Sequence, residues 1–111
     1  MNVIFLPEVQ KYYAYLEDIL YEKGYFGFKE SSRSYVKELI ENIKTGLPLL
    51  PHRPAPAYFD KYGKNMDYAV FRVRKNKNTQ WYVFFTTYKE YGETIYLVRY
   101  ISNNHISAQH L

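Results

Sequence analysis

Apolar side chains recur every three or four positions through the first half of the chain, which is the spacing of one helix face. One such stripe begins at Pro7, which suits the first turn of a helix, and stops at Gly24, a residue that commonly ends helices. A second stripe covers about residues 32–45, and Ser31 or Ser32 can cap its start. Because the segment between the stripes is short, we predict two antiparallel neighbouring helices.

The period changes to two in the last third of the chain, where apolar and polar residues alternate as in half-buried strands. Polar turns at residues 75–78 and 90–93 separate three strands, the last over residues 94–102, and an apolar run at residues 3–6 predicts one earlier strand. The predicted order is β-α-α-β-β-β, an α+β fold in which a twisted antiparallel sheet packs on the N-terminal helical hairpin. We expect Trp81, in the middle strand of the meander, to pack against the helices and the other sheet face to stay partly open.

The longest segment without a periodic pattern covers residues 47–64 and carries four of the five prolines. Prolines remove backbone donors and bias the preceding residue away from helix. The segment also contains His52 and Arg53. It is either a functional loop or a stiff crossing from the helices to the sheet.

Length and composition restrict the class of protein. The chain of 111 residues is predicted to form one domain, residues 1–111, and its formal charge of +4 favours polyanionic partners. It has no cysteine, which excludes disulfides, thiol nucleophiles and cysteine-ligated metal centres. No apolar run reaches the length of a signal peptide or a membrane span, so we expect a cytoplasmic protein with no membrane association.

Most familiar catalytic motifs do not occur in the sequence. It contains no phosphate-binding glycine loop, dinucleotide fingerprint, HExxH or nucleophile elbow. His105 and His110 are five positions apart, His52 is distant, and no carboxylates show ligand spacing around them. We therefore expect no metal and no cofactor.

A group of cations at the end of the first meander strand is a candidate phosphate site. Arg72 and Arg74 share one face of that strand, and Lys75 and Lys77 follow in the turn. Guanidinium groups that lack a carboxylate partner can hold phosphate oxygens through paired hydrogen bonds. The alternative is a solvated strand face whose charges prevent aggregation at the sheet edge.

Arg99 and Tyr100 lie in the otherwise apolar last strand. A buried arginine without a partner is costly, so Arg99 is expected either to be paired or to belong to a functional site. Strict alternation points Arg99 and Tyr100 to opposite faces, and they can share a pocket only if a β-bulge intervenes.

The polar tail after this strand contains the candidate for proton transfer. This candidate is His105, because histidine is the usual residue for proton transfer and RNA cleavage by the adjacent 2′-hydroxyl requires one proton removed and one supplied. Asn104 beside it can hydrogen-bond bases or phosphates. Alternatively, His105 is a surface residue of the tail and the asparagines close the last turn.

These features together resemble the RelE/ParE superfamily of type II toxins over essentially the whole chain. The resemblance lies in the short strand ending in Pro7-Glu8, the helical pair, the basic aromatic meander, and Arg99-Tyr100 followed by Asn103-Asn104-His105. It implies a toxin that a cognate antitoxin neutralises, and we expect that partner to carry an acidic C-terminal segment. In the ribonuclease branch, ribosome-bound mRNA is cut without metal by attack of a 2′-hydroxyl on the neighbouring phosphate.

The resemblance also implies roles for individual residues. Arg72, Arg74 and Lys75 would bind phosphate, Arg99 would stabilise the phosphorane-like charge, and His105 would act as acid or base. The chain departs from the ribonuclease branch at Gln80-Trp81, where members often carry an arginine. The alternatives are a non-catalytic toxin of the same fold that inhibits DNA gyrase, or an inactive module that binds only its antitoxin.

Overall fold

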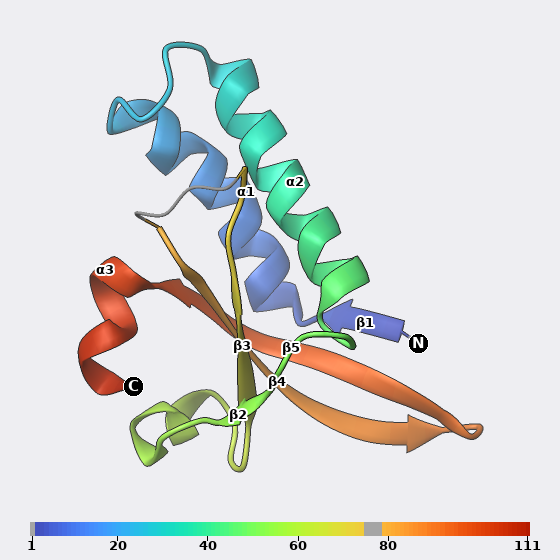
Figure 1. Cartoon of the computed structure of the whole chain (residues 1–111). Coiled ribbons are helices and arrows are strands. Elements are labelled where there is room, and N and C mark those ends of the chain that lie inside the picture. Colours follow the sequence, from blue (N-terminus) through green and yellow to red (C-terminus); the bar gives the residue numbers. More distant parts are fainter. Residues whose placement is uncertain (1, 75–78) are drawn as a thin grey trace.

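Two antiparallel helices form one layer of the molecule, as the apolar stripes predict (Figure 1). The computed structural model describes residues 2–74 and 79–111. Helix α1 spans Pro7–Glu22 and helix α2 spans Lys29–Gly46. Pro7 occupies the first turn of α1, where its missing N–H costs no hydrogen bond.

The start of α2 differs from the prediction. The helix begins three residues earlier than the apolar stripe, so its N-cap is Phe28, which offers no side-chain hydrogen bond. Ser32 lies inside the helix, and its hydroxyl donates to the carbonyl of Lys29 at 2.8 Å. The prediction that Ser31 or Ser32 caps α2 is therefore wrong.

Within the described residues the sheet has five strands, in the order β1-β5-β4-β3-β2. Strand β1 runs parallel to β5, whereas the other pairs are antiparallel, so the sheet is mixed and the prediction of a purely antiparallel sheet is wrong in this detail. The alternating pattern cannot reveal this, because β1 reaches β5 through the whole intervening chain and not through a hairpin. The strand bounds are Asn2–Phe5 for β1, Arg53–Pro54 for β2, Asp67–Phe71 for β3, Trp81–Glu90 for β4 and Glu93–Asn103 for β5.

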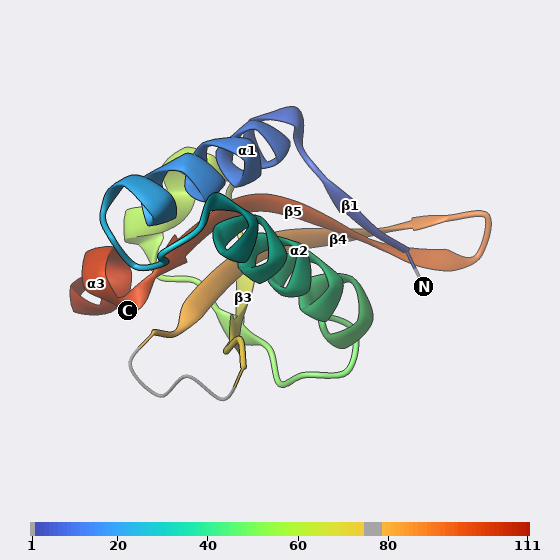
Figure 2. The same ribbon diagram turned by 90° about the horizontal axis from the view of Figure 1, so that it is seen from above.

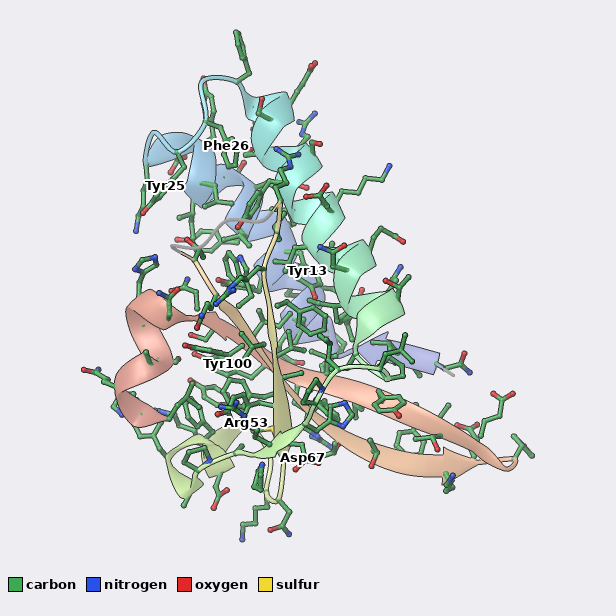
Figure 3. All side chains as sticks on the ribbon, viewed as in Figure 1. Tyr13, Tyr25, Phe26, Arg53, Asp67 and Tyr100 are labelled. Carbon is green, nitrogen blue, oxygen red and sulfur yellow. The ribbon has the colours of Figure 1, made fainter. Side chains whose placement is uncertain are left out.

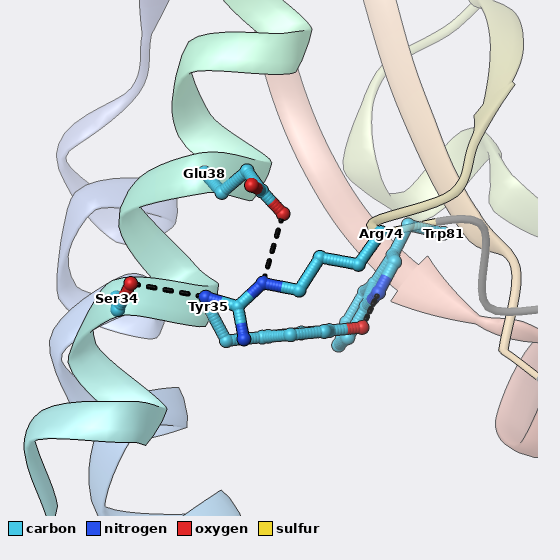
Figure 4. A network of polar contacts seen from close by, with 5 residues as sticks. All are labelled: Ser34, Tyr35, Glu38, Arg74 and Trp81. Carbon is cyan, nitrogen blue, oxygen red and sulfur yellow. Dashed lines mark hydrogen bonds and ion pairs between the residues drawn. The ribbon is translucent and has the colours of Figure 1, made fainter.

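The helical layer covers one face of the sheet, and a β4–β5 hairpin extends beyond it (Figure 2). The core between the two layers includes Trp81, whose indole N–H donates to the hydroxyl of Tyr35 in α2 at 2.9 Å (Figure 4). The expected packing of Trp81 against the helices is confirmed. The α+β class and the order of the predicted elements are also confirmed.

The opposite face of the sheet, which we expected to stay partly open, is covered in part. A short 3-10 helix, η1, spans Ala57–Tyr62 in the proline-rich segment and places Phe59 on this face. Phe59 stacks on Phe84 of β4, with ring centroids 4.4 Å apart, and both side chains are fully buried. This second core also contains Met66, Tyr68 and Tyr82. After β5 the chain ends in helix α3, Asn104–Ser107, and a second 3-10 helix, η2, Ala108–His110.

Candidate functional site

A β-bulge in β5 brings Arg99 and Tyr100 to the same side of the sheet. Phe84 of β4 is paired with Tyr100 and Phe85 with Val98, so Arg99 is an extra residue on β5. The bulge shifts the alternation: Val98 and Ile101, three positions apart, both enter the core under the helices. The condition under which Arg99 and Tyr100 can share a pocket is therefore met.

Both residues line a pocket of about 520 Å³ at the edge of the sheet. Strand β1 pairs with β5 only as far as Val98, whose carbonyl accepts from the N–H of Leu6 at 3.1 Å. Beyond this point four consecutive β5 residues, 99–102, line the pocket, with α1 on one side and η1 on the other. Tyr100 lies toward the α3 end of the sheet (Figure 3). The remaining lining residues are Leu6, Glu8, Val9, Tyr12, Lys61, Tyr62 and Ile106.

Stacked aromatic rings form the η1 side of this pocket. The ring of Tyr62 lies parallel to that of Tyr100, with centroids 3.7 Å apart and an interplanar angle of 4°. The ammonium group of Lys61 lies 5.4 Å from the ring centroid of Tyr62 and 4.4 Å from that of Tyr58. Tyr58 in turn stacks on His110 at 3.6 Å. The stack therefore ties η1 both to β5 and to the C-terminal residues.

Two of the pocket tyrosines keep their protons well above neutral pH. Burial, and secondarily the neighbouring Tyr100, raises the pKa of Tyr12 from 10.0 to about 12. Burial, together with a hydrogen bond with Tyr100, raises the pKa of Tyr62 to about 12 as well. At neutral pH both phenols are hydrogen-bond donors, and neither is available as a phenolate base.

The pocket has an excess of positive charge. Among the described residues, the cations Lys61 and Arg99 and one carboxylate, Glu8, line it. Over residues 2–74 and 79–111, no ion pair involves Arg99, and its Nε donates to the hydroxyl of Thr86 at 3.0 Å. A half-buried guanidinium without a carboxylate partner is suited to binding an anion.

The other predicted arginines lie elsewhere. Arg74 is held by α2: its Nε lies 3.1 Å from a carboxylate oxygen of Glu38, an Nη donates to Ser34 at 3.0 Å, and its guanidinium lies over the ring of Tyr35 (Figure 4). These contacts hold Arg74 against α2, so it is not the unpaired cation that we considered for a phosphate site.

Arg72 is exposed and lines a different, smaller hollow of about 430 Å³ near the C-terminal end of α2. That hollow also involves Asn42 and Thr45, and none of its lining residues belongs to the pocket beside β5. The structure therefore does not bring Arg72 or Arg74 together with Arg99. The predicted phosphate ligands Lys75 and Lys77 lie outside the described residues.

His105 lies in the first turn of α3 and is exposed. The backbone N–H of His105 donates a hydrogen bond to the side-chain oxygen of Asn103. Ile106, the residue after His105, lines the pocket. Asn104 has its backbone N–H and side-chain oxygen bonded to the backbone of Gln80, at 3.0 Å and 2.9 Å. His105 is thus next to the pocket along the chain, whereas Asn104 fastens α3 to the start of β4.

Sequence reasoning missed several residues that build the pocket. Tyr12 fits the apolar stripe of α1, so its position at the pocket has no separate signal in the sequence. Lys61 and Tyr62 lie in the proline-rich segment, where the density of aromatic residues at positions 58–62 was a usable signal. Thr86 and Gly63 contact the side chain of Arg99 although they are distant from it in the sequence. No sequence pattern predicts such contacts.

No metal-binding group and no membrane-spanning helix is found in the described part of the chain. No cluster of three or more His, Cys, Asp or Glu residues there could hold a metal ion. No helix there is both long and apolar enough to cross a membrane. Comparisons with protein-family models, curated proteins and solved structures give no significant match for this chain.

Proposed function

We propose that this chain is the toxin of a type II toxin–antitoxin pair of the RelE/ParE kind, and that it cleaves ribosome-bound mRNA without a metal ion. The observation that carries the proposal is the half-buried guanidinium of Arg99, which has no ion-pair partner in residues 2–74 and 79–111 and lines a pocket with three tyrosines. Such a pocket offers one group for a phosphate and several aromatic faces and hydroxyls for a base or ribose. The helical pair on a sheet is compatible with the proposed family.

The proposed reaction is attack of a ribose 2′-oxygen on the adjacent phosphorus, with departure of the 5′-oxygen of the next nucleotide. The phosphorus gains a bond to the 2′-oxygen and loses the bond to the 5′-oxygen, which leaves a 2′,3′-cyclic phosphate. Arg99, assisted by Lys61, would neutralise the charge that grows on the phosphate oxygens. Aromatic faces beside the phosphate would hold the unpaired bases in place.

Two proton transfers complete this reaction. The 2′-hydroxyl loses a proton to a base, and the departing 5′-oxygen receives one. We assign one of these transfers to His105, which lies two residues beyond the end of β5 and is next to the lining residue Ile106 along the chain. The phenols of Tyr12 and Tyr62 stay protonated at neutral pH and can donate hydrogen bonds to the phosphate, whereas their raised pKa values make them weak proton donors.

The test is induced expression of the wild-type chain and of His105→Ala in a host without the antitoxin. We expect growth arrest and new 5′ ends on an abundant mRNA with the wild type. With His105→Ala we expect cleavage to fall about 100-fold, the usual contribution of one acid or base, with the fold intact. Primer extension measures the cuts, and circular dichroism of the purified variant checks the fold. A His105→Ala variant that cuts mRNA at the wild-type rate would remove His105 from the reaction.

The second candidate is a non-catalytic toxin of the same fold that inhibits DNA gyrase, or an inactive module that binds only its antitoxin. Two observations favour it: no histidine is among the described residues that line the pocket, and Arg74 is engaged by α2. In this case wild-type expression would arrest growth and leave mRNA intact, and His105→Ala would arrest growth equally.

A further inference from the structure

The bulge alone does not determine where the guanidinium of Arg99 lies, because an arginine side chain has several rotatable bonds. Arg99 is nevertheless fixed at two points along its length. Its Nε donates to Thr86 Oγ1 at 3.0 Å, and its Cδ passes close to Gly63. These two contacts come from different elements, β4 and the end of η1.

The contact with Thr86 occupies only one of the donor positions of the guanidinium. Thr86 is paired with Leu97, two residues before Arg99, so its hydroxyl lies within reach of the bulged residue. Nε is engaged by Thr86, and no residue in the ranges 2–74 and 79–111 bonds the two terminal nitrogens, so they can act as a pair of donors. Two parallel N–H donors match the geometry of two phosphate oxygens.

The contact with Gly63 restricts the position of the aliphatic part of the Arg99 side chain. A Cβ atom at position 63 would lie 2.7 Å from Cδ of Arg99 and 3.3 Å from its Nε. Any other residue at this position would therefore displace the arginine or the end of η1. Gly63 is also held in place, since its N–H donates to the carbonyl of Asp60 at 3.1 Å.

We propose that Thr86 and Gly63 are positioning residues that hold the guanidinium of Arg99 ready to bind a phosphate group. Neither residue lines the pocket, so both act through Arg99. Their role in catalysis depends on the ribonuclease function proposed above, but their role in phosphate binding does not. The expected benefit is pre-organisation, because the arginine side chain is already ordered before the substrate binds.

The first test compares Thr86→Val with Thr86→Ser, and Thr87→Val serves as the matched control. Valine has the shape of threonine without the acceptor, serine keeps the hydroxyl, and Thr87 is exposed on the same strand. With programmed ribosomes we expect kcat to fall about tenfold in Thr86→Val while KM stays within about twofold. The reason is that a less ordered guanidinium of Arg99 stabilises the transition state less than before. Thr86→Ser and Thr87→Val should match the wild type. Equal kcat in Thr86→Val and Thr87→Val would overturn the proposal.

The second test does not require cleavage. Inorganic phosphate is titrated into each variant, and binding is followed by the backbone amide NMR signals of residues 99–102. We expect Thr86→Val and Gly63→Ala to bind phosphate about tenfold more weakly than Thr87→Val, as fits the weakening of one charge-assisted contact. Phosphate binding in Thr86→Val equal to that in Thr87→Val would refute the positioning role, even if the wild type cleaves RNA. If the wild type cuts no RNA but shows this dependence on Thr86, the proposed function fails and the positioning role stands.

Discussion

At the scale of single residues, partners decide what each arginine does. Arg74 has a carboxylate, a hydroxyl and an aromatic ring around it, so its charge holds the segment that follows β3 against α2. Arg99 has only the hydroxyl of Thr86 among the described side chains that bond it. The sequence showed both as arginines in strand patterns and left the structural and functional alternatives open for each.

The first prediction concerns Arg74. Replacement by glutamine removes the ion pair with Glu38 and the contact with Tyr35, both partly solvated, so we expect the free energy of unfolding to fall by about 0.5–1 kcal/mol. Cleavage of RNA should be unchanged. Urea denaturation measures the stability, and Arg72→Gln is the control, since Arg72 forms no ion pair with any described residue. A large loss of cleavage in Arg74→Gln would show that Arg74 contacts the substrate.

The second prediction concerns the half-buried phenols of Tyr12 and Tyr62. Their pKa values are about 12 in the folded chain and 10.0 in the reference state, so the unfolded chain loses these protons first as pH rises. The unfolded state then binds fewer protons, and the free energy of unfolding should fall between pH 10 and 12. Tyr12→Phe should make this fall less steep, whereas Tyr15→Phe, at an exposed position, should not. Denaturation curves at several pH values measure the slope, and identical slopes in both variants would contradict the assignment.

At the scale of elements, the periodic segments could be predicted and the aperiodic ones could not. The two helices, the meander and the packing of Trp81 follow from spacing, because burial of one face imposes a regular pattern. The short helices η1 and α3 leave no such pattern, and the prolines before η1 indicate only that a regular helix is interrupted. The bulge at Arg99 is one extra residue in an apolar strand. The sequence pattern allows such a bulge but does not show whether it occurs.

The third prediction tests the attachment of η1. Phe59 is its buried anchor, stacked on Phe84, so Phe59→Ala should lower the free energy of unfolding by about 3–5 kcal/mol. Tyr58→Ala, at an exposed position of the same helix, should cost far less. Chemical denaturation of both variants measures the difference. A cost below about 1 kcal/mol for Phe59→Ala would mean that η1 is not held by the second core.

At the scale of the whole molecule, two layers and a terminal helix build one pocket from distant parts of the chain. Residues of α1, η1, β5 and α3 meet where β1 ends and the edge of β5 becomes free. The sequence indicated Arg99 and Tyr100 of β5, and the aromatic density at positions 58–62 was a usable signal for Lys61 and Tyr62. It could not indicate Tyr12, which only the packing of α1 against the sheet brings to the pocket. The same packing separates Arg72 from Arg99, although both were expected to meet the same phosphate.

The most direct test of the central claim, RNA cleavage at the pocket of Arg99, compares three chains expressed in a host without the antitoxin. They are the wild type, Arg99→Gln and Arg33→Gln, and the last removes the same charge from an exposed site on α2. We predict new 5′ ends on mRNA for the wild type and Arg33→Gln, and a loss of about 100-fold or more for Arg99→Gln, as expected when one donor to the developing charge is removed. Equal cleavage by Arg99→Gln and Arg33→Gln, or intact mRNA in all three, would contradict the account.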